Sequence, residues 1–518
     1  MPSHHQRGSL FFSSFANSIA SNPIEKDGWL GYTLAQDLAA MSSDSSELKR
    51  MCVCGHSTRF GVLVIGALCF SLYMATGIAF YSAMVPMTDL TTSPLFSNDS
   101  SVDVDYSSWD LPMADRRFTY SVMEKSWLIG NVFLGLLVGS VPLMAFMNRF
   151  GPHPTVILLG TASTVITAFI PLAASLGTPF LAVLRFVQGI GFANIFPIIG
   201  SIMTRWAAIT ESGLFISLLT GYIQLSIIIS TPISGVFAKN FGWPSIYYVH
   251  AAIAGALTII WALFFRNDPA KHPFVGDKEI RKISTGKPPM ASIKKPTNVP
   301  YRAILTSPAI WVVWIACVGN YLATQFSITF FYMYLVWVLK IDGETAGFVA
   351  PIPLVTQLIL KFVTGLVSDR ITFMSERNKC RFFNSLAFYG AAFFFVVLAF
   401  VHPEDKMICA FLAMLPQAMI GFNPGGFNKS SVLVARQHSP AVLAVTQVIL
   451  CMTLFFGSFI VLSMTPNSTF EEYRCVFLLY AVVLVVTNTI FVIFCRAEAA
   501  EWTKDKPQQA DRVSPSSA

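Results

Sequence analysis

The feature that most constrains this chain is a series of about twelve apolar stretches, each long enough to cross a bilayer as a helix. They run over residues 61–86, 127–147, 155–176, 180–202, 213–237, 246–265, 308–338, 345–367, 382–401, 407–427, 441–463 and 474–495. Of all residues, 54% are hydrophobic and only 12% are charged, whereas soluble domains carry roughly 25% charged residues. We therefore expect an all-α integral membrane protein.

The longest polar interruption between these stretches, residues 266–307, leaves six on either side and is rich in lysine and arginine. This pattern predicts two six-helix bundles, at 59–265 and 308–496, joined by a cytoplasmic linker at 266–307. Residues 1–58 and 497–518 are polar and are predicted to be cytoplasmic tails, the first of them disordered. The first bundle is expected to carry an outer loop at 87–126.

The distribution of basic residues predicts the orientation. Lysines and arginines flank the spans on the same side as the linker, at Lys49, Arg50, Arg59, Arg149, Arg205, Arg370, Arg377, Lys379, Arg381, Lys429, Arg436 and Arg496. Cytoplasmic loops carry such an excess, so both termini are expected in the cytoplasm. The opposite side holds two glycosylation sequons, at Asn98 and Asn467, which predict a glycoprotein.

The stretch 181–206 carries Arg185 and Gln188 inside an apolar segment. An arginine at the centre of a membrane helix costs roughly 2.5–3.5 kcal/mol on insertion scales, so it is expected to face a cavity, a partner or a substrate. The two residues are three apart and share one helix face. A polar stripe on a membrane helix is one way to build a solute site.

A second pattern occurs in both halves. Gly365 precedes Asp369 and Arg370 at the linker-side end of the span 345–367, and a weaker copy places Gly139 before Arg149 in the first half. A pattern in equivalent places indicates an internal repeat. We expect the glycines to admit close neighbours and the charges to form bonds between the halves that close a gate.

Taken together, these motifs resemble the major facilitator superfamily, and within it the anion–cation symporter family of organic-anion and phosphate carriers. The resemblance runs from about Phe118 to Arg496. It rests on RFVQG at 185–189 with Pro197, TGY at 220–222 with Pro232 and Gly235, FGW at 241–243, GLVSDR at 365–370 with Lys379, Arg381 and Asn384, and GFN at 421–423. It implies two six-helix bundles, alternating access and transport of an anion, driven by sodium, protons or membrane potential.

The chain departs from that family at three charged positions. Aligned with organic-anion carriers, Ala79 and Asn320 stand where the family has arginines, and Phe192 stands where it has a carboxylate. Arg185 is then the one inherited cation. These departures leave the substrate and the coupling ion open.

Further polar side chains inside the spans are candidates to line the site or to bond between helices. The candidate substrate-binding residues are Arg185, Gln188, Tyr222, Gln224, Asn320, Gln325 and Asn423, with Asn131, Tyr321 and Gln357 as further polar residues in spans. Amides and phenols offer both donors and acceptors, so they suit a neutral or zwitterionic solute as well as an anion. Lys361, one turn from Gln357, either snorkels to the interface or acts as a second cation.

Three functions stay open: a secondary active transporter of a small organic anion, one of a neutral or zwitterionic metabolite, and a transporter-like receptor or scaffold. No catalytic or metal-binding motif is present in the sequence, so neither an enzyme nor a cofactor is expected, beyond a coupling Na⁺ or H⁺. The expected partners are a solute and lipid. The formal charge of +7 lies between apolar spans and does not indicate nucleic acid. We expect a functional monomer in the plasma membrane rather than a lysosomal or vesicular one.

Overall fold

The computed structural model describes residues 57–89, 105–208, 211–285, 300–371, 373–401 and 404–503. Within these ranges the chain is helical, and eleven helical segments are long and apolar enough to cross a membrane. The remaining predicted span, 213–237, forms two helices instead. The predicted all-α membrane fold is confirmed.

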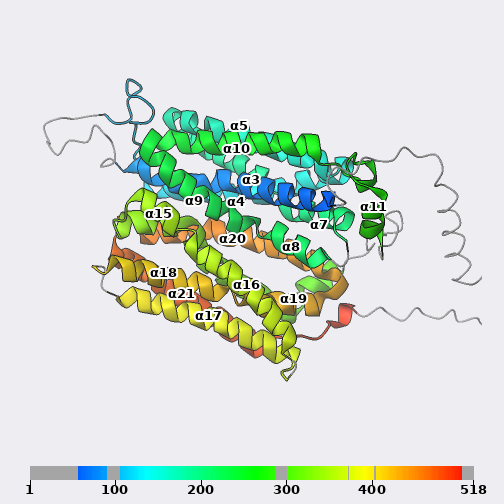
Figure 1. The fold of residues 1–518 in the computed structure, drawn as a ribbon. Coiled ribbons are helices and arrows are strands. Elements are labelled where there is room, and N and C mark those ends of the chain that lie inside the picture. Colours follow the sequence, from blue (N-terminus) through cyan, green and yellow to red (C-terminus); the bar gives the residue numbers. More distant parts are fainter. Residues whose placement is uncertain are drawn as a thin grey trace, which may run out of the picture.

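The first half of the molecule comprises the helices before the linker. They are α3 (Thr58–Thr88), α4 (Val122–Phe150), α5 (Pro152–Leu176), α6 (Thr178–Gly191), α7 (Ile195–Trp206), α8 (Ser212–Thr220), α9 (Tyr222–Phe241) and α10 (Trp243–Phe264). Figure 1 shows them as a bundle whose helices run roughly side by side.

The second half follows the linker. Its helices are α13 (Pro308–Gln325), η5 (Phe326–Phe330), α14 (Phe331–Met333), η6 (Tyr334–Val338), α15 (Gly343–Val349), α16 (Ile352–Arg370), α17 (Glu376–Phe400), α18 (Lys406–Ile420), η7 (Asn423–Gly425), α19 (Phe427–Ala435), η8 (Arg436–His438), α20 (Ser439–Met464), α21 (Phe470–Phe494) and η9 (Glu501–Thr503). Here η5 and η6 are π-helical turns that continue α13.

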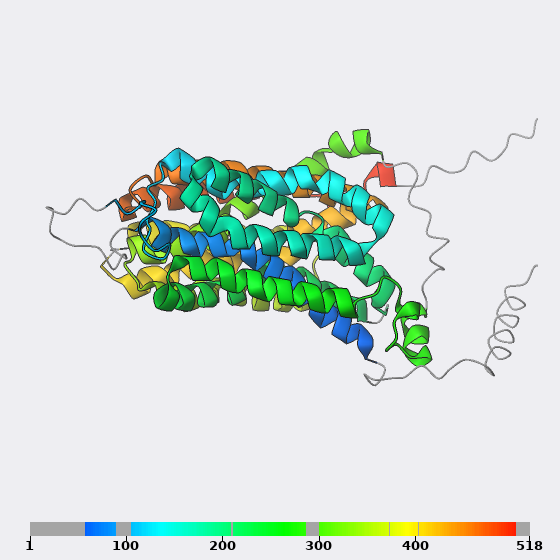
Figure 2. The ribbon, with the colours of Figure 1, turned by 90° about the horizontal axis from the view of Figure 1, so that it is seen from above.

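The two ends of the bundle differ, and we name them by what they carry. The loop face is the end at which residues 105–121 and α15 lie, and the tail face is the end at which α3 begins and α21 ends (Figure 1). Seen from above, the helices of both halves run lengthwise between these two faces (Figure 2).

Equivalent helices of the two halves are interrupted near their middle. In the first half, α6 and α7 are separated at residues 192–194, where Asn194 has a φ of 69°. In the second half, α18 and α19 are separated by η7. There the carboxamide of Asn384 accepts a hydrogen bond from the backbone of Phe427 (3.1 Å) and donates one to Asn488 (2.7 Å). Interrupted helices leave backbone groups for neighbouring side chains to bond.

Glycines set the packing of α4 against α6. A Cβ added at Gly189 would lie 2.0 Å from the carbonyl oxygen of Val132, and one at Gly135 would lie 1.9 Å from that of Phe186. Only hydrogen fits at such positions, so the two helices approach as membrane helices do at small residues. This contact places Arg185 against α3 and α4.

Part of the linker is folded against the first half. This part contains η3 (Pro269–Lys271) and α11 (Asp277–Ser284), whereas α12 (Tyr301–Leu305) packs against α13 of the second half. Arg59 on α3 pairs with Glu211 (2.6 Å) and with Glu279 of α11 (3.2 Å), and Lys282 of α11 also pairs with Glu211 (2.7 Å). These ion pairs fasten α11 to the tail face of the first half.

Candidate functional site

Arg185 lies in the middle of the first half and is fully buried. Its Nε donates to the carbonyl oxygen of Leu128 on α4 (3.1 Å), and its Nη1 donates to that of Gly77 on α3 (3.3 Å) and to Oε1 of Gln188 (2.5 Å). The guanidinium therefore joins three helices. The predicted shared face of Arg185 and Gln188 is present as a direct hydrogen bond.

The charge of Arg185 is met by rings rather than by an anion. Its guanidinium carbon lies 4.1 Å from the ring centre of Phe80 and 5.7 Å from that of Tyr81. Within the described ranges no carboxylate pairs with it, and its Nη2 makes no hydrogen bond. Aromatic faces offset only part of the cost of a desolvated cation. The site therefore retains positive charge and one free donor.

Gln188 is fully used in holding the helices together. Its Nε2 donates to the carbonyl oxygen of Thr76 (3.1 Å) and to the hydroxyl of Thr167 on α5 (3.2 Å). Nearby, Phe192 packs against Gly77, where an added Cβ would lie 2.5 Å from the Phe192 ring. Phe192 thus covers the backbone that Arg185 binds, and Gln188 orients Arg185 in this conformation.

The seam between the halves contains the predicted residues of α9. The carboxamide of Gln224 donates to that of Gln357 on α16 across the seam (3.4 Å), and both side chains are buried. Tyr222 contacts Phe196 ring to edge, with the ring centres 5.8 Å apart. The structure therefore brings Gln224 and Gln357 together, while Tyr222 packs on Phe196 of its own half and also interacts with Cys451 of α20 in the second half.

The second half places its amides in two groups. Asn423 donates to Asn320, while the buried Oδ1 of Asn423 stays without a partner. Gln325 donates to the carbonyl oxygen of Leu454 (2.8 Å) and to the hydroxyl of Ser458 (2.9 Å), and its Oε1 also stays without a partner. Buried acceptors left unpaired are costly, so they are candidates to receive a donor from a solute.

Lys361 supplies a second cation. It is half-buried on α16, one turn beyond Gln357, and therefore on the helix face that meets the seam. In the part of the chain that the structure describes, no hydrogen bond or ion pair of Lys361 is found. Arg185 and Lys361 thus give each half one cation without a carboxylate partner.

Among the predicted gating residues whose side chains the structure describes, none meets the other half in this conformation. Gly139 packs against Ile190 of its own half, with an added Cβ 2.9 Å from the Ile190 Cα, and Gly365 has open space around it. Arg149 and Arg370 are exposed, and the side chain of Asp369 lies outside the described part of the structure. Their gating role stays a prediction.

The contacts that do close the seam lie toward the loop face. Lys239 of α9 pairs with Glu344 of α15 (2.5 Å). An added Cβ at Gly347 would lie 2.7 Å from the carbonyl oxygen of Thr231. On the other side of the molecule, Trp127 of α4 packs on two phenylalanines of α20, with ring centres 5.2 and 5.8 Å away. Sequence analysis missed these contacts, because only their three-dimensional placement pairs them.

At the tail face, charges pair within each half. Arg59, Glu211 and Lys282 form one group in the first half. In the second half, Glu376 pairs with Lys379 (2.6 Å) and Lys429 (2.9 Å). Among the ion pairs of the described residues, none crosses the seam at this face.

Sequence analysis also missed His250, although a histidine inside the apolar span 246–265 is a readable signal. It is fully buried on α10. Its Nδ1 lies 2.7 Å from the carbonyl oxygen of Ile246, and its Nε2 lies 3.0 Å from the hydroxyl of Ser230, which also bonds to the carbonyl oxygen of Ala75 (3.3 Å). His250 therefore links α3, α9 and α10 through a group that can take a proton.

Of the predicted glycosylation sites, Asn98 lies outside the described residues. Asn467 is exposed at the loop face between α20 and α21, and its side chain donates to Glu472 (2.9 Å). Its glycosylation stays a prediction.

Comparison with known proteins agrees with this architecture. A family model described as Major Facilitator Superfamily matches residues 63–461. Sialin of Homo sapiens is 24% identical over 455 residues, which cover 86% of this chain and 91% of sialin. Sodium-dependent phosphate transport protein 1 of Oryctolagus cuniculus is also 24% identical over 455 residues, which cover 86% of this chain and 93% of that protein. The expected resemblance to anion–cation symporters is confirmed.

Two solved structures share the fold. A bacterial homolog of the human lysosomal transporter Spinster, in an inward-facing and occupied conformation, aligns with a TM-score of 0.63 and 13% identity over 85% of this chain and 97% of its own. A D-xylose-proton symporter aligns with a TM-score of 0.62 and 12% identity over 85% and 98%. From the family match and this fold together, the chain belongs to the Major Facilitator Superfamily and is a multi-pass membrane transporter, not an enzyme.

Proposed function

We propose that this protein is a secondary active transporter that carries a small organic anion by alternating access between its two halves. The observation that carries the proposal is the pair of cations Arg185 and Lys361, one in each half, neither with a carboxylate partner among the described residues. An uncompensated cation within the membrane is costly. A bound anion at the seam lowers that cost.

The surrounding amides suit the polar part of such a solute. Gln224 and Gln357 lie at the seam, and Asn320 and Asn423 bond to each other within the second half. In this arrangement Arg185 is bonded to backbone carbonyls and to Gln188, so its role includes orienting the site from within the first half. A change of conformation is needed before its free nitrogen meets solute.

The distribution of contacts between the halves supports alternating access. The loop face is closed by Lys239–Glu344, Trp127 and Gly347, whereas the tail-face ion pairs of the described residues stay within each half. This is the pattern of a transporter closed at one side. With cytoplasmic termini, as the positive-inside rule predicts, the closed side is the outer one.

A zwitterionic solute is the second candidate. The unpaired acceptors Asn423 Oδ1 and Gln325 Oε1 favour it, because an ammonium group supplies the donors that they lack. The two cations would then bind the carboxylate of the same molecule. A receptor or scaffold that moves no solute is the remaining outcome.

Uptake into proteoliposomes tests the proposal. The purified protein is reconstituted and supplied with labelled mono- and dicarboxylates, zwitterionic amino acids and neutral sugars under imposed gradients. We expect anion uptake that Arg185→Ala abolishes and Arg185→Lys partly keeps, and that Lys361→Gln weakens more than Lys361→Arg. Flux of none of these solutes under any gradient would sink the transport proposal.

For the driving force we propose sodium or membrane potential, because no carboxylate occurs in the interior of the spans. Similarity to sodium-dependent phosphate transport protein 1 supports sodium. His250 is the group that would carry a proton instead. Three results together would reverse this assignment and indicate proton coupling. They are uptake that is unchanged when sodium is removed, uptake that stops when the pH gradient is dissipated, and loss of uptake in His250→Gln.

We propose the plasma membrane as the site of action and a monomer as the functional unit. Surface biotinylation of the intact cell, compared with co-localisation in acidic compartments, decides between the plasma membrane and a lysosomal or vesicular membrane. Light scattering of the detergent complex decides the oligomeric state.

A further inference from the structure

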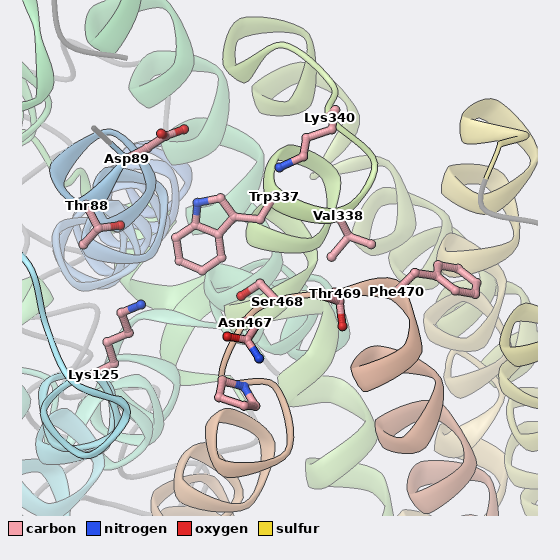
Figure 3. Close-up of a pocket in the computed structure, with 11 residues that line it drawn as sticks. Thr88, Asp89, Lys125, Trp337, Val338, Lys340, Asn467, Ser468, Thr469 and Phe470 are labelled. Atoms are coloured by element: carbon pink, nitrogen blue, oxygen red, sulfur yellow. The ribbon is translucent and has the colours of Figure 1, made fainter. Parts of the chain in front are cut away.

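A pocket of about 440 Å³ opens at the loop face, away from the polar residues of the seam. It is lined by Thr88, Asp89, Lys125, Trp337, Val338, Lys340, Pro466, Asn467, Ser468, Thr469 and Phe470. Figure 3 shows the side chains of Lys125 and Lys340 on opposite sides of Trp337, with Asn467 and Ser468 below the ring. Its volume lies within the range of small-molecule sites.

Both halves of the transporter build this pocket. Thr88, Asp89 and Lys125 come from α3 and α4 of the first half, whereas Trp337 and residues 466–470 come from the second. The Nζ of Lys125 lies 5.5 Å from the ring centre of Trp337, so one cation already reaches across the seam. A ligand here would touch both halves at once.

The charge of the pocket is positive and incompletely paired. Within the described ranges, no side-chain hydrogen bond or ion pair is found for Lys125 or Lys340, in contrast to Lys239, which pairs with Glu344 at the same face. The carboxylate of Asp89 also interacts electrostatically with Arg117. Burial lowers the pKa of Arg117, and Asp115 and Asp89 offset part of that shift. Two lysines therefore face the pocket with one carboxylate that is shared elsewhere.

The backbone at both second-half rims is held in an unusual conformation. Lys340 and Ser468 each have a φ of 53°, in the left-handed region that non-glycine residues rarely adopt. Such positions cost on the order of 1–3 kcal/mol and persist where the surroundings impose them, often at ligand sites. Here they present an ammonium and a hydroxyl to one cavity.

We propose that this pocket binds a small anion, held by Lys125 and Lys340 beside Trp337, and that the anion bridges the two halves and favours the conformation closed at the loop face. The ligand class is a carboxylate or phosphate. The conformational consequence rests on the proposed transport cycle, whereas the binding itself does not. The site is distinct from the one around Arg185.

Binding is tested on the full-length purified protein with succinate and inorganic phosphate as probes, by calorimetry and by the change in tryptophan fluorescence. We expect saturable binding, with a fluorescence change that Trp337→Phe removes. Lys125→Gln and Lys340→Gln should each weaken binding about tenfold, which corresponds to about 1.4 kcal/mol. Lys406→Gln is the control, because it removes an exposed lysine at the start of α18 that does not line the pocket, and it should leave binding unchanged.

Two further arms separate the alternatives. Nanodiscs of phosphatidylcholine and of phosphatidylserine test whether the anion is a lipid headgroup. A fluorescence change that follows phosphatidylserine content, with no response to succinate or phosphate, would overturn a soluble ligand. Arg185→Ala should abolish uptake and leave probe binding intact, which separates this proposal from the transport site. The proposed anion site would be overturned if Arg185→Ala abolished probe binding while the Lys125→Gln, Lys340→Gln double variant kept it.

Cysteine accessibility measures the conformational effect. A cysteine placed at Ser468, inside the pocket, should react more slowly with a membrane-impermeant maleimide when an anion is bound. A cysteine at Thr345, on α15 outside the pocket, should also react more slowly. The anion does not shield position 345 directly, so protection there reports closure of the loop face. Protection at position 468 alone would show occupancy without bridging and would overturn the second part of the proposal.

Discussion

The loop face and the tail face of this transporter use similar residues in opposite ways. At the loop face, charges, rings and glycines of one half meet those of the other, as in Lys239–Glu344 and Gly347 against Thr231. At the tail face, comparable charges pair within a half, as Glu211 does with Arg59 and Glu376 does with Lys429.

This difference shows what distinguishes a closed face from an open one. It is whether charges pair between the two halves or within one half, rather than how many charges the face carries. Exposed ion pairs contribute little by themselves, typically less than about 1 kcal/mol. Close backbone approach at glycine is harder to replace, because a side chain must displace the neighbouring helix. The glycines should therefore govern closure and the ion pairs should adjust it.

The strongest test of this comparison is Gly347→Leu. The new side chain would collide with the carbonyl oxygen of Thr231, 2.7 Å from the added Cβ, and prevent the loop face from closing. We expect anion uptake to fall about 100-fold, near 2.8 kcal/mol, with increased maleimide access at the loop face. Gly200→Leu is the control, since no atom lies within 4 Å of its added Cβ. Normal uptake by Gly347→Leu would contradict the assignment.

The tail-face counterpart is Gly365→Leu. Open space surrounds Gly365 in this conformation, so the variant should fold normally and keep the loop face closed. If this glycine meets the other half when the tail face closes, uptake should fall about tenfold, near 1.4 kcal/mol. Double electron–electron resonance between labels on α8 and α16 would then show a distribution of label distances confined to the longer distances of an open tail face. An unchanged distribution and rate would remove Gly365 from the gate.

The ion pair at the loop face should have a smaller effect. Lys239 is more than half exposed, so Lys239→Gln should shift the closed population by roughly fivefold at most. Glu344→Gln should match it, and the double variant should be no worse than either single one. The shift should also shrink at high salt, because salt screens exposed pairs. Additive effects of the two single variants would argue against a direct pair.

The smallest effect at neutral pH is expected from the tail-face pair of Glu211. Hydrogen bonding from Arg59, and then from Lys282, lowers the pKa of Glu211 from 4.5 to about 2. A depressed pKa means that the stabilisation is complete above the unfolded value near 4.5 and is lost as pH falls toward about 2. Hydrogen exchange of α11 should therefore quicken within this window.

The variant Glu211→Gln should remove the acid dependence of α11 exchange while uptake at neutral pH stays close to that of the unmodified protein. The conservative variant Glu211→Asp should keep part of the acid dependence of α11 exchange. Acid-quickened exchange of α11 in Glu211→Gln, equal to that of the unmodified protein, would assign the dependence to a group other than Glu211.

Much of the fold could be predicted from the sequence, because each apolar stretch is a local property. The spans, the central linker and the shared face of Arg185 and Gln188 all follow from spacing along one helix. The interruptions were harder. The stretch 345–367 corresponds to one candidate span, as predicted, but the helix is interrupted within it, because α15 ends at Val349 and α16 begins at Ile352. In the sequence, Pro351 is the residue that indicates this interruption. Gly421 and Pro424 indicate the interruption in the stretch 407–427.

The site was predictable in its residue types and not in its bonds. Arg185 could be identified as a buried cation from its apolar surroundings, but its partners are carbonyl oxygens, and every residue has one of those. The pocket of Lys125 and Lys340 could not be found either, because its residues lie more than 200 positions apart in the chain.

The sequence by itself determined that this chain enters the membrane as two repeated helical halves with an arginine inside one of them. Hydrophobicity, helix period and the distribution of basic residues act within a few turns and can be read directly. Only the tertiary structure decided which face is closed, because that depends on which surfaces of two separate bundles meet. The same pairing of distant surfaces placed Lys239 on Glu344 and left Lys125 and Lys340 facing a shared pocket.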